Sequence, residues 1–211
     1  MLLDTTKHYP VMADEVLSYI SDNKIIVDCT FGGGGYSTRI LKEFKKTQVI
    51  GLDRDNSILK HALNLKENYP DRFDFHNIKF SQINELKNFR DADCFLFDLG
   101  LSNFQLKNMK RGFSFESKDI IDMTMGLNTF NAHDLIKKVS EKELKNILKF
   151  FGEEKFASQI SKKIITYRNS NENLSAKNLS NIINSIKFKK NKTNPSTKTF
   201  QAIRMIVNQE L

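Results

Sequence analysis

Two kinds of hydrophobic pattern alternate along the first half of the chain. Short apolar runs rich in β-branched residues are separated by stretches in which apolar residues recur every three or four positions. The short runs predict buried strands, and the longer stretches predict amphipathic helices. The predicted strands are 25–29, 48–52, 73–76 and 94–97, and the predicted helices are 37–44, a segment from 58 that ends before Pro70, and 81–89. This β-α-β-α-β-α-β order predicts an α/β fold with a parallel, doubly wound sheet.

The second half of the chain has a different pattern. Residues 106–129 are loop-like, and no strand-forming run comparable to those of the first half follows them. Helical periodicity then predicts helices at about 132–138, 141–151, 153–167, 175–186 and 197–210, with Pro195 just before the last. We therefore expect a sheet-containing part followed by a helical part.

Composition narrows the class of protein. The 211 residues are 39% hydrophobic and 27% charged, with nine Gly and three Pro, which excludes a collagen-like chain and a wholly disordered one. No apolar run approaches the roughly 18–20 residues of a membrane-spanning helix, and the N-terminus has no basic-then-apolar leader. We therefore expect a cytoplasmic protein. Cys29 and Cys94 lie in apolar runs without metal-ligand spacing, so we expect core residues and predict no metal site.

Charge is distributed unevenly between the two halves. Residues 1–100 hold 13 Lys and Arg against 15 Asp and Glu, a net charge of −2, whereas residues 101–211 hold 20 against 10, a net charge of +10. An excess of positive charge in one half indicates a polyanionic partner, most simply nucleic acid. The alternative is that these lysines only form solvated helix faces.

The glycine run 32–35 follows the first predicted strand and precedes a predicted helix. Glycines allow close approach of a ligand to the backbone, and the first turn of a helix offers free N–H groups, so this loop is a candidate cofactor site. Asp53 ends the second strand 18 residues after Gly35, a position from which a carboxylate binds ribose hydroxyls in nucleotide-binding folds. The loop lacks the lysine of a phosphate-binding P-loop, and on these features a nicotinamide cofactor remains open.

Asp98 follows the fourth predicted strand and is expected at the same sheet edge as the glycine loop. Its carboxylate can accept a hydrogen bond from an amino group of a ligand or substrate. The alternative is an aspartate that only caps the turn after the strand. Gln105 can hold the edge of a cofactor through its amide, or it can be an ordinary surface residue.

Eight motifs follow one another along the chain: HYPVMADEVL (8–17), DCTFGGGGYS (28–37), GLDRD (51–55), FDLGLSNFQL (97–106), RGFSF (111–115), DMTM (122–125), GEEKFA (152–157) and NPSTKTFQAIR (194–204). In this order they resemble one family, the RsmH (MraW) family of S-adenosylmethionine-dependent methyltransferases. Members of that family methylate the N4 amine of a cytidine in 16S ribosomal RNA. The resemblance covers nearly the whole chain.

The resemblance implies a Rossmann-like methyltransferase core interrupted by a helical substrate-binding insertion. On this basis we expect core residues 1–105, an insertion over 106–196, and a helix over 197–211 that returns towards the core. The resemblance implies cofactor contacts at Gly34, Gly35, Tyr36, Asp53, Phe80, Asp98 and Gln105. It places Asp53 on the ribose hydroxyls, Phe80 beside the adenine, and Asp98 near the methionine end, where it is also the candidate catalytic residue. The family usually has His in place of Tyr36.

The substrate implied by the resemblance is 16S rRNA within the small ribosomal subunit. Phe104, Phe113 and Phe115 are candidates to receive an unstacked cytosine, with core packing as the alternative role. The candidates for phosphate contacts are basic residues of the second half: Arg111, Lys187, Lys189, Lys190, Lys192, Lys198 and Arg204.

Family members continue well beyond the helix of 197–210 and return to the core for its last strands. The resemblance therefore implies that this chain lacks the C-terminal part of the family. Two functions follow as hypotheses: an active rRNA cytidine methyltransferase, and a non-catalytic remnant that binds RNA. An oxidoreductase on the same broad fold is disfavoured, because the chain offers no plausible hydride-site His or Tyr–Lys pair.

Overall fold

The computed structural model describes residues 10–87, 89–170, 173–187 and 193–210. The chain forms two compact units, Met1–Asn103 and Phe104–Leu211. Among the helices of the described ranges, none combines the length and the apolar character needed to cross a bilayer.

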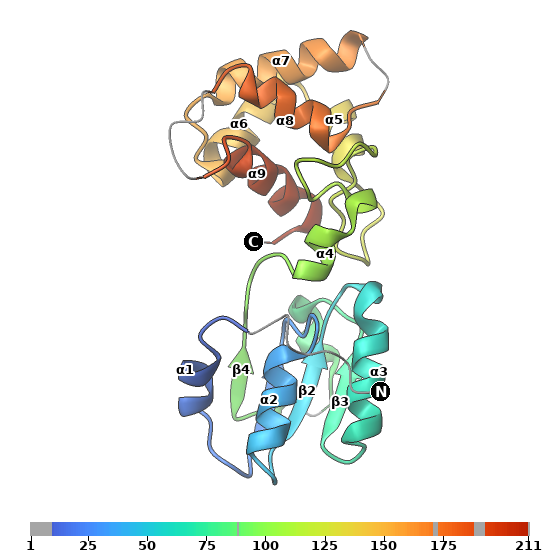
Figure 1. The fold of residues 1–211 in the computed structure, drawn as a ribbon, viewed down its shortest axis with the longest axis vertical. Helices are drawn as coiled ribbons and strands as arrows, with labels where there is room; N and C mark the ends of the chain where they lie inside the picture. Colours follow the sequence, from blue (N-terminus) through green and yellow to red (C-terminus); the bar gives the residue numbers. More distant parts are fainter. Residues whose placement is uncertain (1–9, 88, 171–172, 188–192, 211) are drawn as a thin grey trace. The chain divides into compact units, whose positions relative to one another are not determined.

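A four-stranded parallel sheet organises the first unit, as the hydrophobic pattern predicts (Figure 1). Its strands lie in the order β3-β2-β1-β4. All three pairings are parallel, with Val27 of β1 opposite Ile50 of β2 and Phe95 of β4. The strands are β1 (Ile25–Asp28), β2 (Gln48–Leu52), β3 (Phe73–His76) and β4 (Cys94–Leu96). Because the strands are parallel, their carboxyl ends meet at one edge of the sheet.

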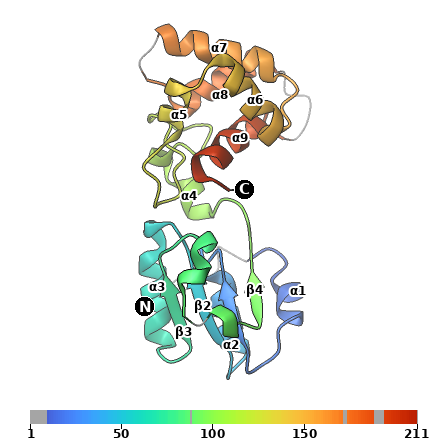
Figure 2. The same cartoon turned by 180° about the vertical axis from the view of Figure 1, so that it is seen from behind.

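Helices cover one face of this sheet, and an irregular segment covers the other (Figures 1 and 2). The three helices are α1 (Ala13–Ser18), α2 (Gly35–Glu43) and α3 (Leu59–Asn68). On their side, Ile40 of α2 and Ala62 of α3 pack with Ile26 and Val49 of the sheet. On the opposite side a smaller cluster contains Val27, Cys29 and Leu52 and is covered in part by Ile83.

The predicted helix over 81–89 is wrong. The segment forms two short 3₁₀ helices, Phe80–Glu85 and Phe89–Asp91, and neither contains a fully buried residue. An α-helix of this length needs a continuous apolar stripe to stabilise it. Here Ile83 and Leu86 make only partial contacts with the sheet, and the N–H of Gln82 bonds the carbonyl of Lys79 at 2.8 Å in an i→i+3 turn. The short helix α1, at the start of the described chain, was not predicted.

Phe31 fixes the shape of the loop between β1 and α2. Its ring is buried at 3% exposure, with centroids 5.4 Å from Phe73 and 5.3 Å from Phe75. A Cβ on Gly34 would lie 2.7 Å from the Phe31 ring, and one on Gly51 of β2 would lie 2.8 Å from it. Gly34 also adopts a φ of +73°, which L side chains rarely tolerate. These glycines are therefore required by the packing of Phe31.

The second unit is helical, apart from the long loop before α5. Within it α6 packs against both α7 and α9 (Figures 1 and 2). A capping box at Ser140 and Glu143 starts α6. The α-helices are α4 (Asn103–Lys107), which begins at the last residue of the first unit, α5 (Ala132–Lys138), α6 (Glu141–Gly152), α7 (Ala157–Ser170), α8 (Ala176–Asn184) and α9 (Thr197–Asn208).

Helix α9 packs inside the second unit. Its buried Asn208 accepts a hydrogen bond from the N–H of Met125 at 2.8 Å and donates one to the carbonyl of Met123 at 2.7 Å. These bonds tie the loop before α5 to the last helix. The predicted boundaries 1–105, 106–196 and 197–211 stay predictions, and the structure groups α9 with the helices that precede it.

The crossing of α6 and α9 leaves no room for a side chain on Gly152. A Cβ on Gly152 would lie 2.5 Å from the carbonyl oxygen of Lys198 and 3.0 Å from the Cβ of Ala202. Because backbone has to move to relieve this overlap, Gly152→Ala should lower the free energy of unfolding by about 1–3 kcal/mol. Asn146→Ala, on the exposed side of the same helix, should change it by less than about 0.5 kcal/mol. Urea unfolding followed by circular dichroism measures both, and equal effects would contradict the proposed contact.

Candidate cofactor site

Three aspartates gather where adjacent strands of the sheet end. Asp28 is the last residue of β1, Asp53 follows β2, and Asp98 lies two residues after β4. Strand β1 lies between β2 and β4, so the three positions are on neighbouring strands at one edge. We call Asp28, Asp53 and Asp98 the acidic edge.

Asp53 is held by backbone donors on both of its oxygens. Oδ1 accepts from the N–H of Asp55 at 2.8 Å, and Oδ2 accepts from the N–H of Gly32 at 2.7 Å. Burial raises the pKa of Asp53, and these two N–H bonds oppose the rise. The bond to Gly32 fixes the glycine loop against the end of β2. Each carboxylate oxygen keeps a second acceptor site, so the side chain can still bind hydroxyl groups.

Asp28 is a site residue that the sequence analysis missed. Its carboxylate is fully buried and accepts hydrogen bonds from Ser37 Oγ at 2.7 Å and from the N–H of Thr30 at 3.4 Å. Burial raises the pKa of Asp28 to about 6, with smaller upward contributions from Asp53 and Asp98. The available signal was an aspartate at the end of an apolar strand, directly before a glycine loop and nine residues before a helix-starting serine.

Asp98 is exposed, and its backbone is anchored through Thr30. The N–H of Asp98 donates to Thr30 Oγ1 at 2.7 Å. Thr30 therefore connects the end of β4 to the loop after β1, and through its own N–H it connects both to Asp28. The result is a bonded chain from Asp98 through Thr30 and Asp28 to Ser37 at the start of α2.

The predicted loop residues lie at the start of α2, and each has a structural partner. The hydroxyl of Tyr36 donates to the carbonyl of Val11, and its ring is buried. A Cβ on Gly35 would lie 2.8 Å from Cγ of Pro10. Gly34 and Gly35 are thus needed because a Cβ at either position would overlap a neighbouring side chain. From the sequence we had expected these glycines to allow close approach of a ligand. The first N–H groups of α2 still lack intrahelical acceptors and face beyond the helix end.

Phe80 contributes an exposed aromatic surface to the first unit. Its side chain is 36% exposed and meets the ring of Phe97 edge to face, with the centroids 5.5 Å apart. Gln105 is buried, at 7% exposure, and belongs to the second unit. The structure therefore gathers six of the seven predicted cofactor residues in one unit and describes Gln105 in the other.

The electrostatics of the acidic edge suit a positively charged ligand. Asp53 and Asp98 are close enough to raise the pKa of Asp28, so the three carboxylates share one field. Such a field disfavours anionic ligands and favours cations, because complementary charge stabilises the bound state. S-adenosylmethionine carries a sulfonium and an ammonium group, and its carboxylate suits the positive end of a helix such as α2. The residues present therefore fit this cofactor.

The structure separates the predicted phosphate-binding residues into distinct groups. Lys187 forms a 2.8 Å ion pair with Glu154, whose side chain is only 2% exposed. Arg204 bonds both carboxylate oxygens of Glu210 at 2.8 Å. Arg111 donates to the carbonyl of Thr124 and lies over the ring of Phe113. Lys198 remains half exposed, and Lys189, Lys190 and Lys192 lie outside the described residues.

The three aromatic candidates also differ. Phe113 is buried at 4% exposure, and Phe115 packs edge to face on Phe200 at 4.7 Å, so both contribute to the core of the second unit. Phe104 is 40% exposed. Only Phe104 therefore presents a ring for contact with a ligand.

Neither cysteine is in a disulfide. Cys29 is buried, which raises the pKa of its thiol to about 12, and Cys94 is partly buried. Among the described residues no group of three or more His, Cys, Asp or Glu is arranged to hold a metal ion.

A parallel sheet in the order 3-2-1-4, with a glycine loop and an acidic edge at its carboxyl ends, defines an incomplete Rossmann-like core of the methyltransferase type. The family model for the MraW methylase family matches residues 5–211, so the chain belongs to that family.

Several curated relatives are similar over nearly the whole chain. The ribosomal RNA small subunit methyltransferase H of Rickettsia canadensis is 42% identical over 207 residues, which are 97% of this chain and 67% of the relative. The protein of the same name from Orientia tsutsugamushi is 39% identical, covering 97% of this chain and 68% of its own length. That of Sulfurihydrogenibium is 37% identical, covering 97% and 73%. The chain thus spans about two thirds of the length of these relatives.

The buried carboxylate of Asp28 predicts a pH dependence of stability. The folded chain binds a proton at Asp28 near pH 6, whereas the unfolded chain does so only near 3.9. The folded state therefore holds more protons between these values, and this group lowers the free energy of unfolding as pH rises from about 4 to 7. Asp28→Asn removes this pH dependence. The free energy of unfolding of the variant minus that of the unsubstituted chain should therefore increase by roughly 2–3 kcal/mol as the pH rises from about 4 to 7.

Urea unfolding at several pH values measures this difference. Asp71→Asn, at an exposed turn, serves as the control and should give a difference that does not vary with pH. A flat difference for Asp28→Asn as well would show that the carboxylate is not buried in the folded chain.

The ion pair of Lys187 predicts a structural role for this residue. Lys187→Ala leaves the buried carboxylate of Glu154 without its cationic partner, so the free energy of unfolding should fall by about 2–4 kcal/mol. Lys198→Ala removes a half-exposed ammonium and should cost less than about 1 kcal/mol. Thermal and urea unfolding compare the two variants, and similar stabilities would refute the structural role of Lys187.

Proposed function

We propose that the protein binds S-adenosylmethionine at the carboxyl edge of its sheet and methylates the N4 amine of a cytidine in 16S ribosomal RNA. The observation that carries this proposal is the acidic edge beside the start of α2, because its charge suits the sulfonium and ammonium groups of the cofactor. The names of the relatives, ribosomal RNA small subunit methyltransferase H, support the substrate class. The 16S rRNA within the small ribosomal subunit is the proposed partner, and a cytoplasmic location stays a prediction.

The cofactor would be held by residues with different chemistry. Asp53 would accept hydrogen bonds from the ribose hydroxyls with the acceptor sites that its backbone bonds leave free. Phe80, supported by Phe97, would provide the apolar surface against the adenine. Gly34, Gly35 and Tyr36 would present the start of α2 to the methionine end. Gln105 stays a predicted contact from the second unit.

When bound, the cofactor would supply a methyl group on a positively charged sulfur, so that an N–C bond to the amine can form as the C–S bond breaks to leave a neutral thioether and the nitrogen gives up a proton. The work left to the protein is positioning and charge stabilisation, and no covalent nucleophile is needed. Asp98 would accept a hydrogen bond from the exocyclic amine and raise the electron density on its nitrogen. The bond from Asp98 N–H to Thr30 would hold this backbone in place during transfer.

Titration calorimetry with S-adenosylmethionine tests the proposal on the 211-residue chain. Asp53→Ala removes charged acceptors for two hydroxyls and should weaken binding by roughly 10- to 100-fold. Phe80→Ala removes one face of the adenine site and should weaken it roughly tenfold. Asp71→Ala, an exposed carboxylate in the turn before β3, should bind like the unsubstituted chain.

Two results would count against the proposal. If the chain unfolds cooperatively and yet binds no S-adenosylmethionine, the acidic edge is not a cofactor site, and binding of RNA without methyl transfer remains as the function. If Asp53→Ala and Phe80→Ala both bind as tightly as Asp71→Ala, the cofactor lies elsewhere. Methylation of 16S rRNA in isolated small subunits, followed by nucleoside analysis, then tests the N4 position.

A further inference from the structure

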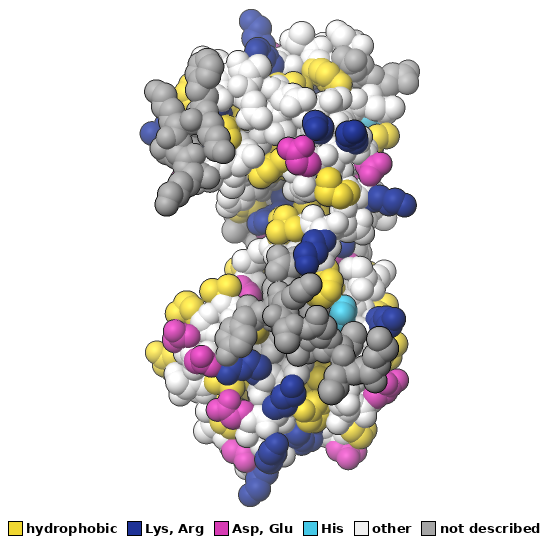
Figure 3. Space-filling view, viewed as in Figure 1, with side chains coloured by type: hydrophobic (Ala, Val, Ile, Leu, Met, Phe, Trp, Pro, Cys, Tyr) yellow, Lys and Arg dark blue, Asp and Glu magenta, His cyan; other side chains and the backbone are white. Residues whose placement is uncertain are grey.

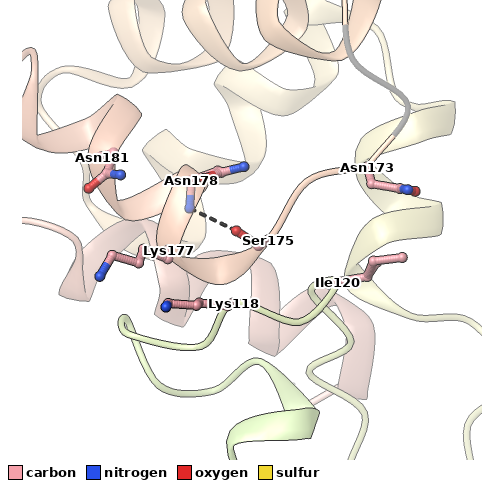
Figure 4. A pocket seen from close by; sticks show the side chains of 7 residues that line it. All are labelled: Lys118, Ile120, Asn173, Ser175, Lys177, Asn178 and Asn181. Atoms are coloured by element: carbon pink, nitrogen blue, oxygen red, sulfur yellow. Dashed lines mark hydrogen bonds between the residues drawn. The ribbon is translucent and has the colours of Figure 1, made fainter.

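A polar pocket in the second unit contains none of the candidate cofactor residues. Its volume is about 400 Å³, within the range of small-molecule sites. It lies between the loop that precedes α5 and the first turns of α8 (Figure 4). The residues that matter for its chemistry are Lys118, Ile120, Ser175, Lys177, Asn178 and Asn181.

Backbone hydrogen bonds join the two segments that form the pocket. The N–H of Ile121 donates to the carbonyl of Leu174 at 3.0 Å, and the N–H of Lys177 donates to the carbonyl of Ser117 at 2.8 Å. Between these bonds, Ile120 and Ser175 form an antiparallel bridge. The walls are therefore fixed before any ligand binds, which lowers the entropic cost of binding.

The first turn of α8 is already satisfied within the protein. The N–H of Asn178 donates to the side chain of Ser175 at 3.0 Å, and that of Lys177 is bonded to Ser117. Contacts to a ligand therefore come from side chains and not from the helix end. Figure 4 shows Lys118 and Lys177 extending on one side of the pocket, with Ile120 on the other.

The side chains of the pocket are of three chemical kinds. Lys118 and Lys177 supply ammonium groups, and the Lys118 ammonium makes no hydrogen bond or ion pair with any described residue. Asn181 offers an exposed carboxamide that likewise bonds no described side chain, while Asn178 is held by the hydroxyl of Tyr167 at 2.6 Å. Ile120 is 47% exposed and supplies apolar surface.

Acidic neighbours limit the positive charge of the pocket. Glu116 pairs with Lys177 at 3.2 Å, with the Glu116 side chain 73% and the Lys177 side chain 41% exposed. Asp119 is exposed next to Lys118. Two lysines beside two carboxylates attract an extended polyanion only weakly. Figure 3 shows the Lys and Arg side chains of the described residues at several separate places on the visible face. A ligand that combines one phosphate with a hydrogen-bonding base suits this pocket better than a uniform polyanion does.

We propose that this pocket binds one nucleotide of single-stranded RNA. The ammonium groups of Lys118 and Lys177 contact the phosphate, the carboxamide of Asn181 bonds the edge of the base, and Ile120 packs against the base. Unstacked bases in single-stranded RNA present such edges to side chains. The inference rests on the proposed function, since it takes RNA to be the substrate, and it adds a second point of contact to the substrate.

Fluorescence anisotropy with a fluorescein-labelled single-stranded RNA of about 12 nucleotides tests the pocket on the 211-residue chain. Lys118→Ala should weaken binding roughly three- to tenfold at low salt and reduce the slope of log affinity against log salt by about 0.7. Asn181→Ala should weaken RNA binding roughly three- to tenfold without changing the salt slope, since it removes no charge.

Two controls separate the pocket from general charge effects. Lys145→Ala, an exposed lysine on α6, should bind the RNA within about twofold of the unsubstituted chain. Labelled heparin, a polyanion without bases, should bind Asn181→Ala and the unsubstituted chain equally. All three substitutions are at exposed positions, so thermal unfolding should show intact folds.

The outcomes are decisive for the pocket. The proposal is overturned if the unsubstituted chain does not bind the RNA, if Lys118→Ala and Asn181→Ala behave like Lys145→Ala, or if Asn181→Ala weakens heparin as much as RNA. Calorimetry with S-adenosylmethionine on the same preparations reports the cofactor site separately. If all preparations bind the cofactor, and Lys118→Ala and Asn181→Ala bind RNA like the unsubstituted chain, the pocket alone is refuted. If the unsubstituted chain binds no cofactor, the proposed function alone is refuted.

Discussion

The packing of Phe31 beneath the glycine loop is the contact on which the first unit depends. The ring lies between Phe73 and Phe75 of the sheet and leaves no room for a Cβ on Gly34 or Gly51. One side chain thus joins the core to the loop that starts α2. Because protein interiors are close-packed, a change in this ring would be transmitted to the start of the helix. The position of the candidate cofactor site is therefore set by core packing.

The three aspartates of the acidic edge differ in how deeply they are buried. Asp28 is buried and paired with Ser37, Asp53 is partly buried and held by two backbone N–H groups, and Asp98 is exposed. The buried carboxylate costs stability, since desolvation raises its pKa to about 6. Its hydrogen bonds connect β1 to α2 and, through Thr30, to β4. The backbone of the exposed Asp98 is thus held in place by hydrogen bonds that run through Thr30 and Asp28 to Ser37.

The sequence predicts much of this fold, because parallel strands buried on both faces have a distinctive apolar signature. All four strands were placed within one residue, and the helices of the second half were found by their periodicity. The prediction failed at 81–89, where apolar residues occur without burial enough to support an α-helix. Lys187 stays a predicted phosphate contact, but its pairing with Glu154, 33 positions away, could not be predicted, because a sequence shows charge and not pairing. Asp28 was missed for the same reason: burial of a carboxylate depends on tertiary contacts.

Lys187 and Arg204 illustrate a common property of charged residues in this chain. Lys187 and Arg204 have carboxylate partners within the helical unit, so the positive charge of these two residues stabilises packing and is less available to a polyanion. Net charge therefore overstates the surface that RNA can use. What remains for recognition are basic side chains that reach solvent, and specificity for a nucleotide requires that they lie beside polar groups able to bond a base. A rigid pocket with few charges satisfies that requirement better than a broad basic face, because hydrogen bonds to a base edge depend on fixed geometry.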